Sequence, residues 1–261
     1  MKTFKIATWN VNSLRVRLSQ VLQWLATAQP DVLALQELKM PTEDFPLEEL
    51  TRAGYYAVVS GQKTYNGVAI LSREVPGTDI ITDIPGLDDH QRRVLAVTVG
   101  GIRVVNLYVP NGESVTSSKY QYKLNWLSQL KHFLAAELSQ HPNMIILGDF
   151  NIAPEAVDVH DPSMWEGRVL FSELERAEYR GMLQLGFTDC FRLCDQAEKS
   201  FSWWDYRLNA FKRNMGLRID HILASASLAK HCQHCVIDKA PRAWERPSDH
   251  TPVMAEFVLE A

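Results

Sequence analysis

The chain has 261 residues, of which 46% are hydrophobic and 22% charged, so it can bury a sizeable core and disorder is not expected. Its net charge of −4 excludes a surface coated in basic residues, although a local basic patch could still meet the phosphates of a nucleic acid. The sequence contains neither an apolar run of the roughly 20 residues that span a bilayer nor a signal-peptide pattern, and we expect a cytoplasmic protein without membrane contacts.

The first part of the chain has the pattern of a strand, a helix and a second strand. Residues 4–8 have the apolar alternation of a short strand. A helix follows, since its apolar residues recur at the spacing of one helix face: Leu18, Val21, Leu22 and Leu25. Pro30 comes after this helix, where a stop is expected. Residues 32–35 are the next predicted strand, and Gln36 and Glu37 come at its end.

Strand patterns continue through the middle of the chain. They cover residues 56–60, 67–71, 94–99 and 102–108. The dipeptide Gly100-Gly101 joins the last two runs and predicts a two-residue hairpin loop. Residues 76–91 have the composition of a loop, but the loop is too short to separate two domains.

The second half of the chain combines helices and strands. A long amphipathic helix has an apolar stripe made of Trp126, Leu127, Leu130, Phe133, Leu134 and Leu138. Residues 144–147 are a predicted strand. Ser172-x-x-Glu175 resembles a capping box and opens a helix that runs to about Leu185. The last predicted strands cover residues 219–223 and 253–258.

Many strands, few helices and mixed connections predict an α/β fold with two packed sheets and helices outside them. No internal repeat and no linker rich in Gly, Ser or Pro divides the sequence. We therefore expect one domain over residues 1–261.

Polar side chains gather where the predicted strands end. They are Asn10 and Asn12, Glu37, Tyr108, Asp149 and Asn151, Asp220, and the pair Asp249 and His250. Each alone is an ordinary turn residue or a solvated side chain. Their shared placement at strand ends predicts a cleft that offers metal ligands, an acid that positions water and a group that stabilises an oxyanion. This is the inventory of a phosphodiesterase.

The four cysteines are Cys190, Cys194, Cys232 and Cys235. The stretch from His231 to Cys235 could indicate a zinc site or a redox pair. The spacing between Cys190 and Cys194 is poor for the second half of a structural zinc site. We therefore expect free thiols on or near a strand edge.

Several motifs resemble those of the exonuclease III branch of the endonuclease/exonuclease/phosphatase superfamily, and they extend over essentially the whole chain. The most specific are Gly148-Asp149-Phe150-Asn151 and Ser248-Asp249-His250. The others are Thr8-Trp9-Asn10-Val11-Asn12, Leu35-Gln36-Glu37-Leu38-Lys39, Asn66-Gly67-Val68-Ala69-Ile70, Gln91-Arg92-Arg93, Asn106-Leu107-Tyr108-Val109-Pro110-Asn111-Gly112 and Gly216-Leu217-Arg218-Ile219-Asp220.

This resemblance implies a four-layered α/β sandwich of the DNase I-like kind, with two mixed sheets flanked by helices. It also implies a Mg²⁺-dependent hydrolase, with Mn²⁺ as a possible substitute, that acts on duplex DNA at abasic sites and 3′ ends. The implied activities are those of a 3′→5′ exonuclease, a 3′-phosphodiesterase or phosphatase, and an abasic-site endonuclease. We expect the protein to be a monomer.

The resemblance also implies roles for the polar residues. The metal set would comprise Asn10, Glu37, Asp149, Asn151, Asp249 and His250, with Glu37 as the principal ligand. Asp149 would orient or deprotonate the attacking water, and Asn151 would hold the phosphate and that water. His250 would donate to a phosphoryl oxygen while Asp220 orients its other ring nitrogen. Tyr108 would contact the phosphate, and it competes with Asp149 for the role of base.

DNA contacts are expected mainly from the segment between Trp203 and Arg218, where aromatic residues alternate with cations. By resemblance, Trp203, Leu217 and Ile219 would line the pocket for a sugar without a base. The other expected contacts are Asn12, Arg92, Asn111, Arg207 and Arg218. An alternative is that the tryptophans at 203 and 204 belong to the core.

Glu113 departs from the pattern, because some abasic endonucleases have an arginine at this place. It favours the alternative of an enzyme specialised in trimming 3′ ends, with weak endonuclease activity. A phosphoinositide or sphingomyelin phosphodiesterase shares the catalytic core, but the tryptophan- and arginine-rich segment argues against it. A DNA-binding module without catalysis is disfavoured, since no expected catalytic residue is missing.

Overall fold

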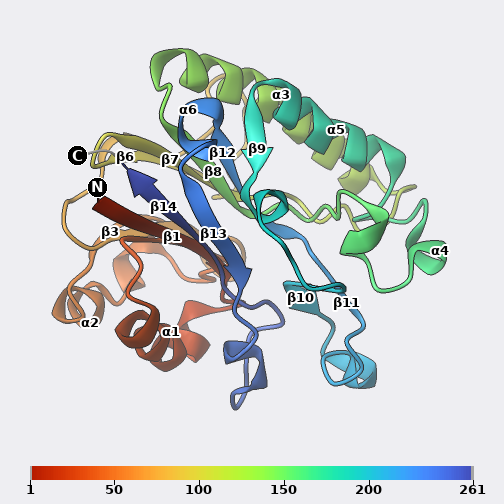
Figure 1. Cartoon of the computed structure of the whole chain (residues 1–261), viewed down its shortest axis with the longest axis horizontal. Helices are drawn as coiled ribbons and strands as arrows, with labels where there is room; N and C mark the ends of the chain where they lie inside the picture. Colours follow the sequence, from red (N-terminus) through yellow and green to blue (C-terminus); the bar gives the residue numbers. More distant parts are fainter. Residues whose placement is uncertain (1, 260–261) are drawn as a thin grey trace.

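The computed structural model describes residues 2–259 and contains two six-stranded mixed β-sheets (Figure 1). The first sheet has the order β13 (Cys232–Ile237), β14 (Val253–Leu259), β1 (Lys2–Asn10), β2 (Val32–Gln36), β4 (Val68–Ser72) and β3 (Tyr56–Ser60). The second has the order β5 (Thr78–Ile81), β6 (Val94–Val99), β7 (Ile102–Tyr108), β8 (Met144–Asp149), β12 (Asp220–Ser225) and β9 (Phe187–Asp189). A small two-stranded sheet pairs β10 (Trp203–Trp204) with β11 (Gly216–Leu217).

The longer helices lie on the outer faces of the sheets, and the small β10–β11 sheet stands at one end of the molecule (Figure 1). The α-helices are α1 (Leu14–Ala28), α2 (Leu47–Arg52), α3 (Ser118–Gln140), α4 (Pro162–Trp165), α5 (Glu173–Gln184) and α6 (Ala226–Ala229). Short 3₁₀ helices are η1 (Thr42–Asp44), η2 (Ala156–Asp158), η3 (Cys190–Leu193), η4 (Arg207–Asn209) and η5 (Pro241–Ala243).

Alternating side chains of the central strands divide the interior into three apolar layers. Ile6 of β1 and Ile145 of β8 belong to the cluster between the two sheets. Trp9 of β1 instead packs in the cluster under α1, and Ile146 of β8 packs in the cluster under α3 and α5. Because both faces of each sheet are covered, the central strands read as continuous apolar runs. The predicted four-layered α/β sandwich is confirmed.

Local signals in the sequence account for several boundaries. Gly100 and Gly101 both have positive φ, which the tight hairpin between β6 and β7 requires, and Val99 pairs with Ile102 across it. The predicted capping box is present at the start of α5, where Ser172 and Glu175 exchange side-chain and backbone hydrogen bonds.

The sequence patterns missed the shorter elements. Strand β5 lies inside the stretch predicted as a loop, and β9, β10, β11 and β13 were not predicted. The first four have at most four residues each, too few for a periodic pattern to be recognised. None of the helices within residues 2–259 is long and apolar enough to cross a membrane.

Candidate active site at the shared end of the two sheets

Two parallel strand pairs bring polar residues to the same end of the sandwich. Strands β1 and β2 run in parallel, so Asn10 at the end of β1 lies near Glu37, which follows β2. Strands β7 and β8 are also parallel, and Tyr108 pairs with Asp149 at their ends. Asp220 lies opposite Asp149 at the start of β12. The topology therefore collects residues from both sheets at one edge.

Gly148 allows β7 and β8 to approach each other directly before Asp149. Its φ is +142°, and a Cβ at this position would lie 1.9 Å from the carbonyl oxygen of Leu107. Any side chain here would push the two strands apart and displace Asp149. The glycine of the Gly-Asp-Phe-Asn motif is thus required by backbone packing.

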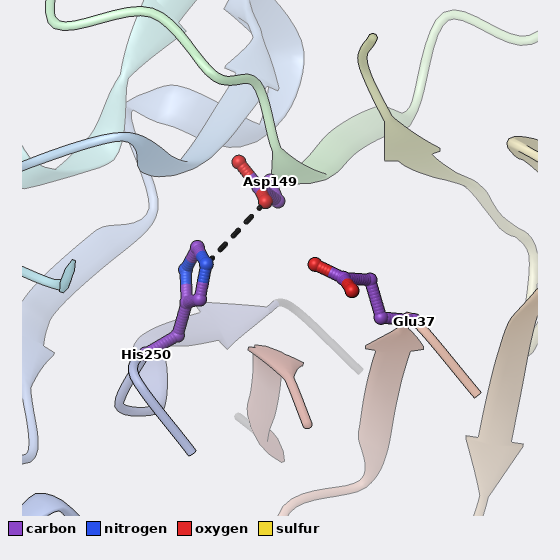
Figure 2. Close-up of side chains that lie close together, drawn as sticks. All are labelled: Glu37, Asp149 and His250. Atoms are coloured by element: carbon purple, nitrogen blue, oxygen red, sulfur yellow. Dashed lines mark ion pairs between the residues drawn. The ribbon is translucent and has the colours of Figure 1, made fainter. Parts of the chain in front are cut away.

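Glu37, Asp149 and His250 converge at the centre of this edge (Figure 2). One ligand atom of each lies within 4.8 Å of the others, and this is the only such group of acidic, His or Cys side chains within residues 2–259. Asn10 connects the two carboxylates, because its Nδ2 donates to Glu37 Oε1 at 2.8 Å and to Asp149 Oδ2 at 2.9 Å. The Lys39 ammonium lies 3.0 Å from the other oxygen of Glu37.

His250 is held between two buried carboxylates. Its Nδ1 donates to Asp220 Oδ2 at 2.9 Å, and its Nε2 lies 3.6 Å from Asp149 Oδ2. Burial alone would lower the pKa of the imidazole, but the charges of Asp220 and Asp149 outweigh it and raise this pKa to about 10. Ser202, which the sequence reading did not single out, donates to Asp220 Oδ2 at 2.6 Å and fixes that carboxylate.

Burial changes the pKa of the Asp149 carboxyl group in the opposite direction to that of the His250 imidazole. Burial raises the pKa of its carboxyl group to about 7, and the nearby charges of Asp220 and Glu37 add to this effect. The charge on His250 and the hydrogen bond from Asn10 act against it. The anionic form of Asp149 is therefore poorly solvated and depends on neighbouring positive charge.

Tyr108 lies beside the same carboxylates. Burial raises the pKa of its phenol well above the ordinary value of 10, and the charges of Glu37 and Asp149 raise it further. The Arg93 guanidinium stacks over the ring at 4.7 Å from its centroid. Tyr108 is consequently a protonated donor at neutral pH.

A buried lysine supports the loops next to Asp149. Lys123, on α3, donates from Nζ to the carbonyl oxygens of Asn151 at 2.6 Å and Asn111 at 3.1 Å, and it forms an ion pair with Glu175 of the capping box. Asn111 Nδ2 donates to Asn151 Oδ1 at 3.2 Å. Sequence patterns missed Lys123, because a lysine in a helix normally reads as a solvated residue.

Asp249 stands apart from the carboxylate group. Its two oxygens accept hydrogen bonds from Asn12 Nδ2 at 2.9 Å and from Trp203 Nε1 at 3.0 Å. Trp203 also forms an isolated β-bridge with His250. The structure therefore brings Asn12, Asp249 and Trp203 together on the side of the site near the small β10–β11 sheet.

A cavity of about 650 Å³ opens beside the carboxylates, and Glu37 and Tyr108 form part of its wall. Lys39, Arg93 and Lys119 bring positive charge to this wall. Arg92 is not among the lining residues, since its guanidinium pairs with Asp83 at 2.8 Å. Of the two neighbouring arginines, Arg93 rather than the predicted Arg92 faces the site.

A second, mostly apolar recess of about 410 Å³ is lined by Trp165, Trp203 and Arg207 among others. Leu217 and Ile219 pack against Trp203 but are fully buried and do not reach this recess. Trp204 is also buried, so the core alternative holds for this one of the two tryptophans.

The expectation that Arg218 contacts DNA is wrong for this structure. Its guanidinium is 1% exposed and forms ion pairs with Asp158 at 2.7 Å and Asp189 at 2.8 Å. A charge buried in this way must be paired, and both partners are in the interior. Arg218 therefore stabilises the interior by joining η2 to the end of β9.

The chain is similar to known enzymes in both sequence and structure. The chain is 37% identical to exodeoxyribonuclease III of Haemophilus influenzae over 97% of its own length and 99% of that protein. It is 47% identical, with a TM-score of 0.96, to the 3′ phosphatase NExo from Neisseria, whose structure contains a product DNA hairpin; the match covers 98% of this chain and all of NExo. An abasic-site (AP) endonuclease from Archaeoglobus fulgidus is 40% identical, with a TM-score of 0.94, over 98% of this chain and all of that one.

The model of one protein family matches residues 7–250, a range that contains every residue placed at the site above. The chain belongs to the endonuclease/exonuclease/phosphatase family.

Proposed function

We propose that this protein is a metal-dependent DNA repair nuclease that hydrolyses phosphodiesters at abasic sites and at 3′ ends of duplex DNA. The convergence of Glu37, Asp149 and His250 at one strand edge carries the proposal. Relatives named as an exodeoxyribonuclease III, an AP endonuclease and a 3′ phosphatase match almost the whole chain, which supports it. The monomeric state and the cytoplasmic location remain predictions.

The carboxylates fit a divalent cation. Asp149 is buried with a pKa raised to about 7, and a nearby cation would relieve the cost of its charge. Glu37 and Asp149 offer the hard oxygen donors that Mg²⁺ prefers, and the same donors accept Mn²⁺. Such an ion would polarise a phosphoryl oxygen and stabilise the leaving 3′ oxygen. His250 fits the role of a ligand poorly, because its Nδ1 is engaged by Asp220 and its raised pKa favours the protonated ring in the metal-free protein.

The remaining chemistry falls to the side chains themselves. Asp149 orients the attacking water and accepts its proton, and it is preferred to Tyr108 because the phenol holds its proton at neutral pH. His250 donates from Nε2 to a non-bridging oxygen as negative charge builds up there. Asp220 is a positioning residue, since it acts through Nδ1 of His250. Asn151 fixes the phosphate and the water.

DNA would approach across the cavity and the recess on the two sides of the carboxylates. Lys39, Arg93 and Lys119 would meet phosphates, while Trp203 and Arg207 would meet sugars or bases on the other side. The wall has these three cations against the two carboxylates of Glu37 and Glu113, so its charge is positive even though the whole chain has a net charge of −4.

Glu113 favours a second candidate, an enzyme that trims 3′ ends better than it incises internal abasic sites. Its carboxylate lines the cavity and pairs with Lys119 at 2.9 Å. It thereby adds negative charge where a continuous duplex would pass and neutralises one of the cations of the wall. A duplex that ends before this point avoids that contact.

The test is a cleavage assay with Mg²⁺ on three substrates: a duplex with one abasic site, a blunt duplex and a phospholipid. We expect hydrolysis of both DNA substrates, its loss on chelation of the metal, and no attack on the phospholipid. The Asp149→Asn protein is the matched control, because it keeps the shape of the side chain and removes the base. Binding without cleavage, or hydrolysis of the phospholipid alone, would contradict the proposal.

A further inference from the structure

The four cysteines meet in one cluster on the side of the sandwich formed by η3 and β13. Cys190 and Cys235 are buried in the core between the sheets, and Cys194 and Cys232 pack against the same core while remaining partly exposed. They come from two segments about forty residues apart in sequence, which only the folded chain brings together. None of them takes part in the hydrolytic site described above.

Cys232 is the central thiol of this cluster. Its proximity raises the pKa of the Cys190 thiol, and burial followed by the charge of Cys232 raises the pKa of the Cys194 thiol. Its own Sγ lies 3.7 Å from the carbonyl oxygen of His234, and Cys194 Sγ lies 3.7 Å from that of Gln233. The two partly exposed thiols are thus held against the same short stretch of backbone.

The setting of Cys232 is also open to small reagents. It lies on β13, the edge strand of the first sheet, at an irregularity in the pairing with β14 between Cys232 and His234. Hydrogen bonds, chiefly from Cys190, lower the pKa of the Cys232 thiol, while the pKa of Cys190 is raised well above its usual range. A thiol with a lowered pKa beside a thiol that keeps its proton is the usual arrangement for thiol–disulfide chemistry.

We propose that Cys194 and Cys232 form a reversible disulfide when the protein meets a peroxide, with Cys232 as the attacking thiolate and Cys194 as the resolving thiol. A preformed metal site is the less favoured use of the cluster. Within residues 2–259 no three cysteine sulfurs lie within 4.8 Å of one another, whereas the carboxylate site passes this test. Cys190, fully buried behind Cys232, is less suited to resolve the oxidised thiol.

The chemistry balances with hydrogen peroxide as the oxidant. The Cys232 thiolate attacks one peroxide oxygen, the O–O bond breaks, hydroxide leaves and takes up a proton as water, and a sulfenic acid remains. The Cys194 sulfur then attacks the Cys232 sulfur, the S–S bond forms, the S–O bond breaks and a second water leaves. The two thiols lose two electrons and the peroxide gains them, and an added dithiol reverses the change.

The bridge would close residues 194–232 into a loop that contains β10, β11 and β12. This loop carries Trp203 and Asp220, so oxidation would tether the segment next to the hydrolytic site. The proposal does not depend on the proposed nuclease activity, because its readout is covalent.

Tryptic mapping distinguishes the possible bridges. Cys190, Cys194 and Cys232 fall on three separate tryptic peptides, residues 181–192, 193–199 and 231–239. After mild peroxide treatment of the full chain and digestion without reductant, we expect the second and third peptides to be joined. Free thiols should fall from four to two per chain and return to four with a dithiol.

Variants settle which sulfurs react, since Cys232 and Cys235 share a peptide. The joined species should vanish in Cys232→Ser and Cys194→Ser and persist in the matched controls Cys235→Ser and Cys190→Ser. In Cys194→Ser the sulfenic acid should persist and become available to a sulfenic-acid-specific label. Three results would each overturn the proposal. They are a bridge that involves residues 181–192, four unreacted thiols after treatment, and purified protein that retains zinc and is thereby protected from peroxide.

Discussion

At the buried centre of the site, Asp149 and Asp220 are 1% exposed and His250 is 4% exposed, and each has at least two polar partners. At its rim, the side chains of Glu113, Lys119 and Arg207 are 60%, 70% and 85% exposed, and within residues 2–259 they form ion pairs only with near neighbours in sequence. Surface pairs of this kind stabilise a fold by little, typically up to about 1 kcal/mol, so the rim residues are free to respond to a substrate. The centre is therefore suited to chemistry and the rim to the choice of DNA.

The largest expected effect lies at the centre. His250→Ala removes the donor to the phosphoryl oxygen, and kcat should fall by about 10²–10⁴-fold with a much smaller change in KM. Steady-state kinetics on a duplex with an abasic site measures both constants. His132→Ala, at an exposed position of α3, is the control and should retain the wild-type kcat. A wild-type kcat in His250→Ala would remove His250 from the mechanism.

The second prediction concerns the support of the centre. Lys123→Met leaves the Glu175 charge buried and unpaired, and the free energy of unfolding should fall by about 3–5 kcal/mol. Urea denaturation measures this loss. Lys131→Met is the matched control, because Lys131 joins the same two helices through Glu178 but is partly exposed, and it should cost less than about 1 kcal/mol. Equal losses in the two variants would contradict the account of a buried support.

The third prediction concerns protonation. His250 keeps its proton up to about pH 10 because the Asp220 charge raises its pKa. Asp220→Asn removes that charge, so the pKa of His250 should fall by about 1–3 pH units. NMR titration of the metal-free protein, with the resonance assigned by its absence in His250→Ala, measures the change. The alkaline loss of kcat should move to lower pH in the same variant. An unchanged titration would mean that Asp220 does not control His250.

The smallest expected effect lies at the rim. Glu113→Arg removes a negative charge from the cavity wall and should raise internal incision at abasic sites relative to 3′-end trimming by a few-fold, about 1 kcal/mol. The ratio of the two rates on matched duplexes is the readout. Glu48→Arg on α2 makes the same change of charge away from the cavity and should leave the ratio unaltered. If Glu113→Arg also leaves it unaltered, the carboxylate does not set the choice.

The buried centre and the exposed rim of the site also differ in how well the sequence could predict them. Glu37, Asp149 and Asp220 lie at or next to strand ends and His250 lies three residues before β14, so the strand pattern and the family motifs together were sufficient to place them at one site. Lys123 and Ser202 act from a helix and a loop, where no local pattern indicates a contact across the fold.

The rim was predicted less well, because exposure depends on packing that short segments do not encode. Arg218 and Arg207 looked equivalent in sequence, yet one is buried between Asp158 and Asp189 and the other is exposed. Arg92 and Arg93 are adjacent, and only the folded chain decides which of them faces Tyr108.

The central claim is that the carboxylates at the strand ends hold the metal on which DNA hydrolysis depends. The most direct measurement is the Mg²⁺ concentration that gives half-maximal cleavage of a duplex with an abasic site, for the wild-type protein and for Glu37→Gln. The substitution keeps the acceptor for Asn10 and removes the charge, so this concentration should rise by about tenfold or more. The same Mg²⁺ dependence in both proteins would contradict the account.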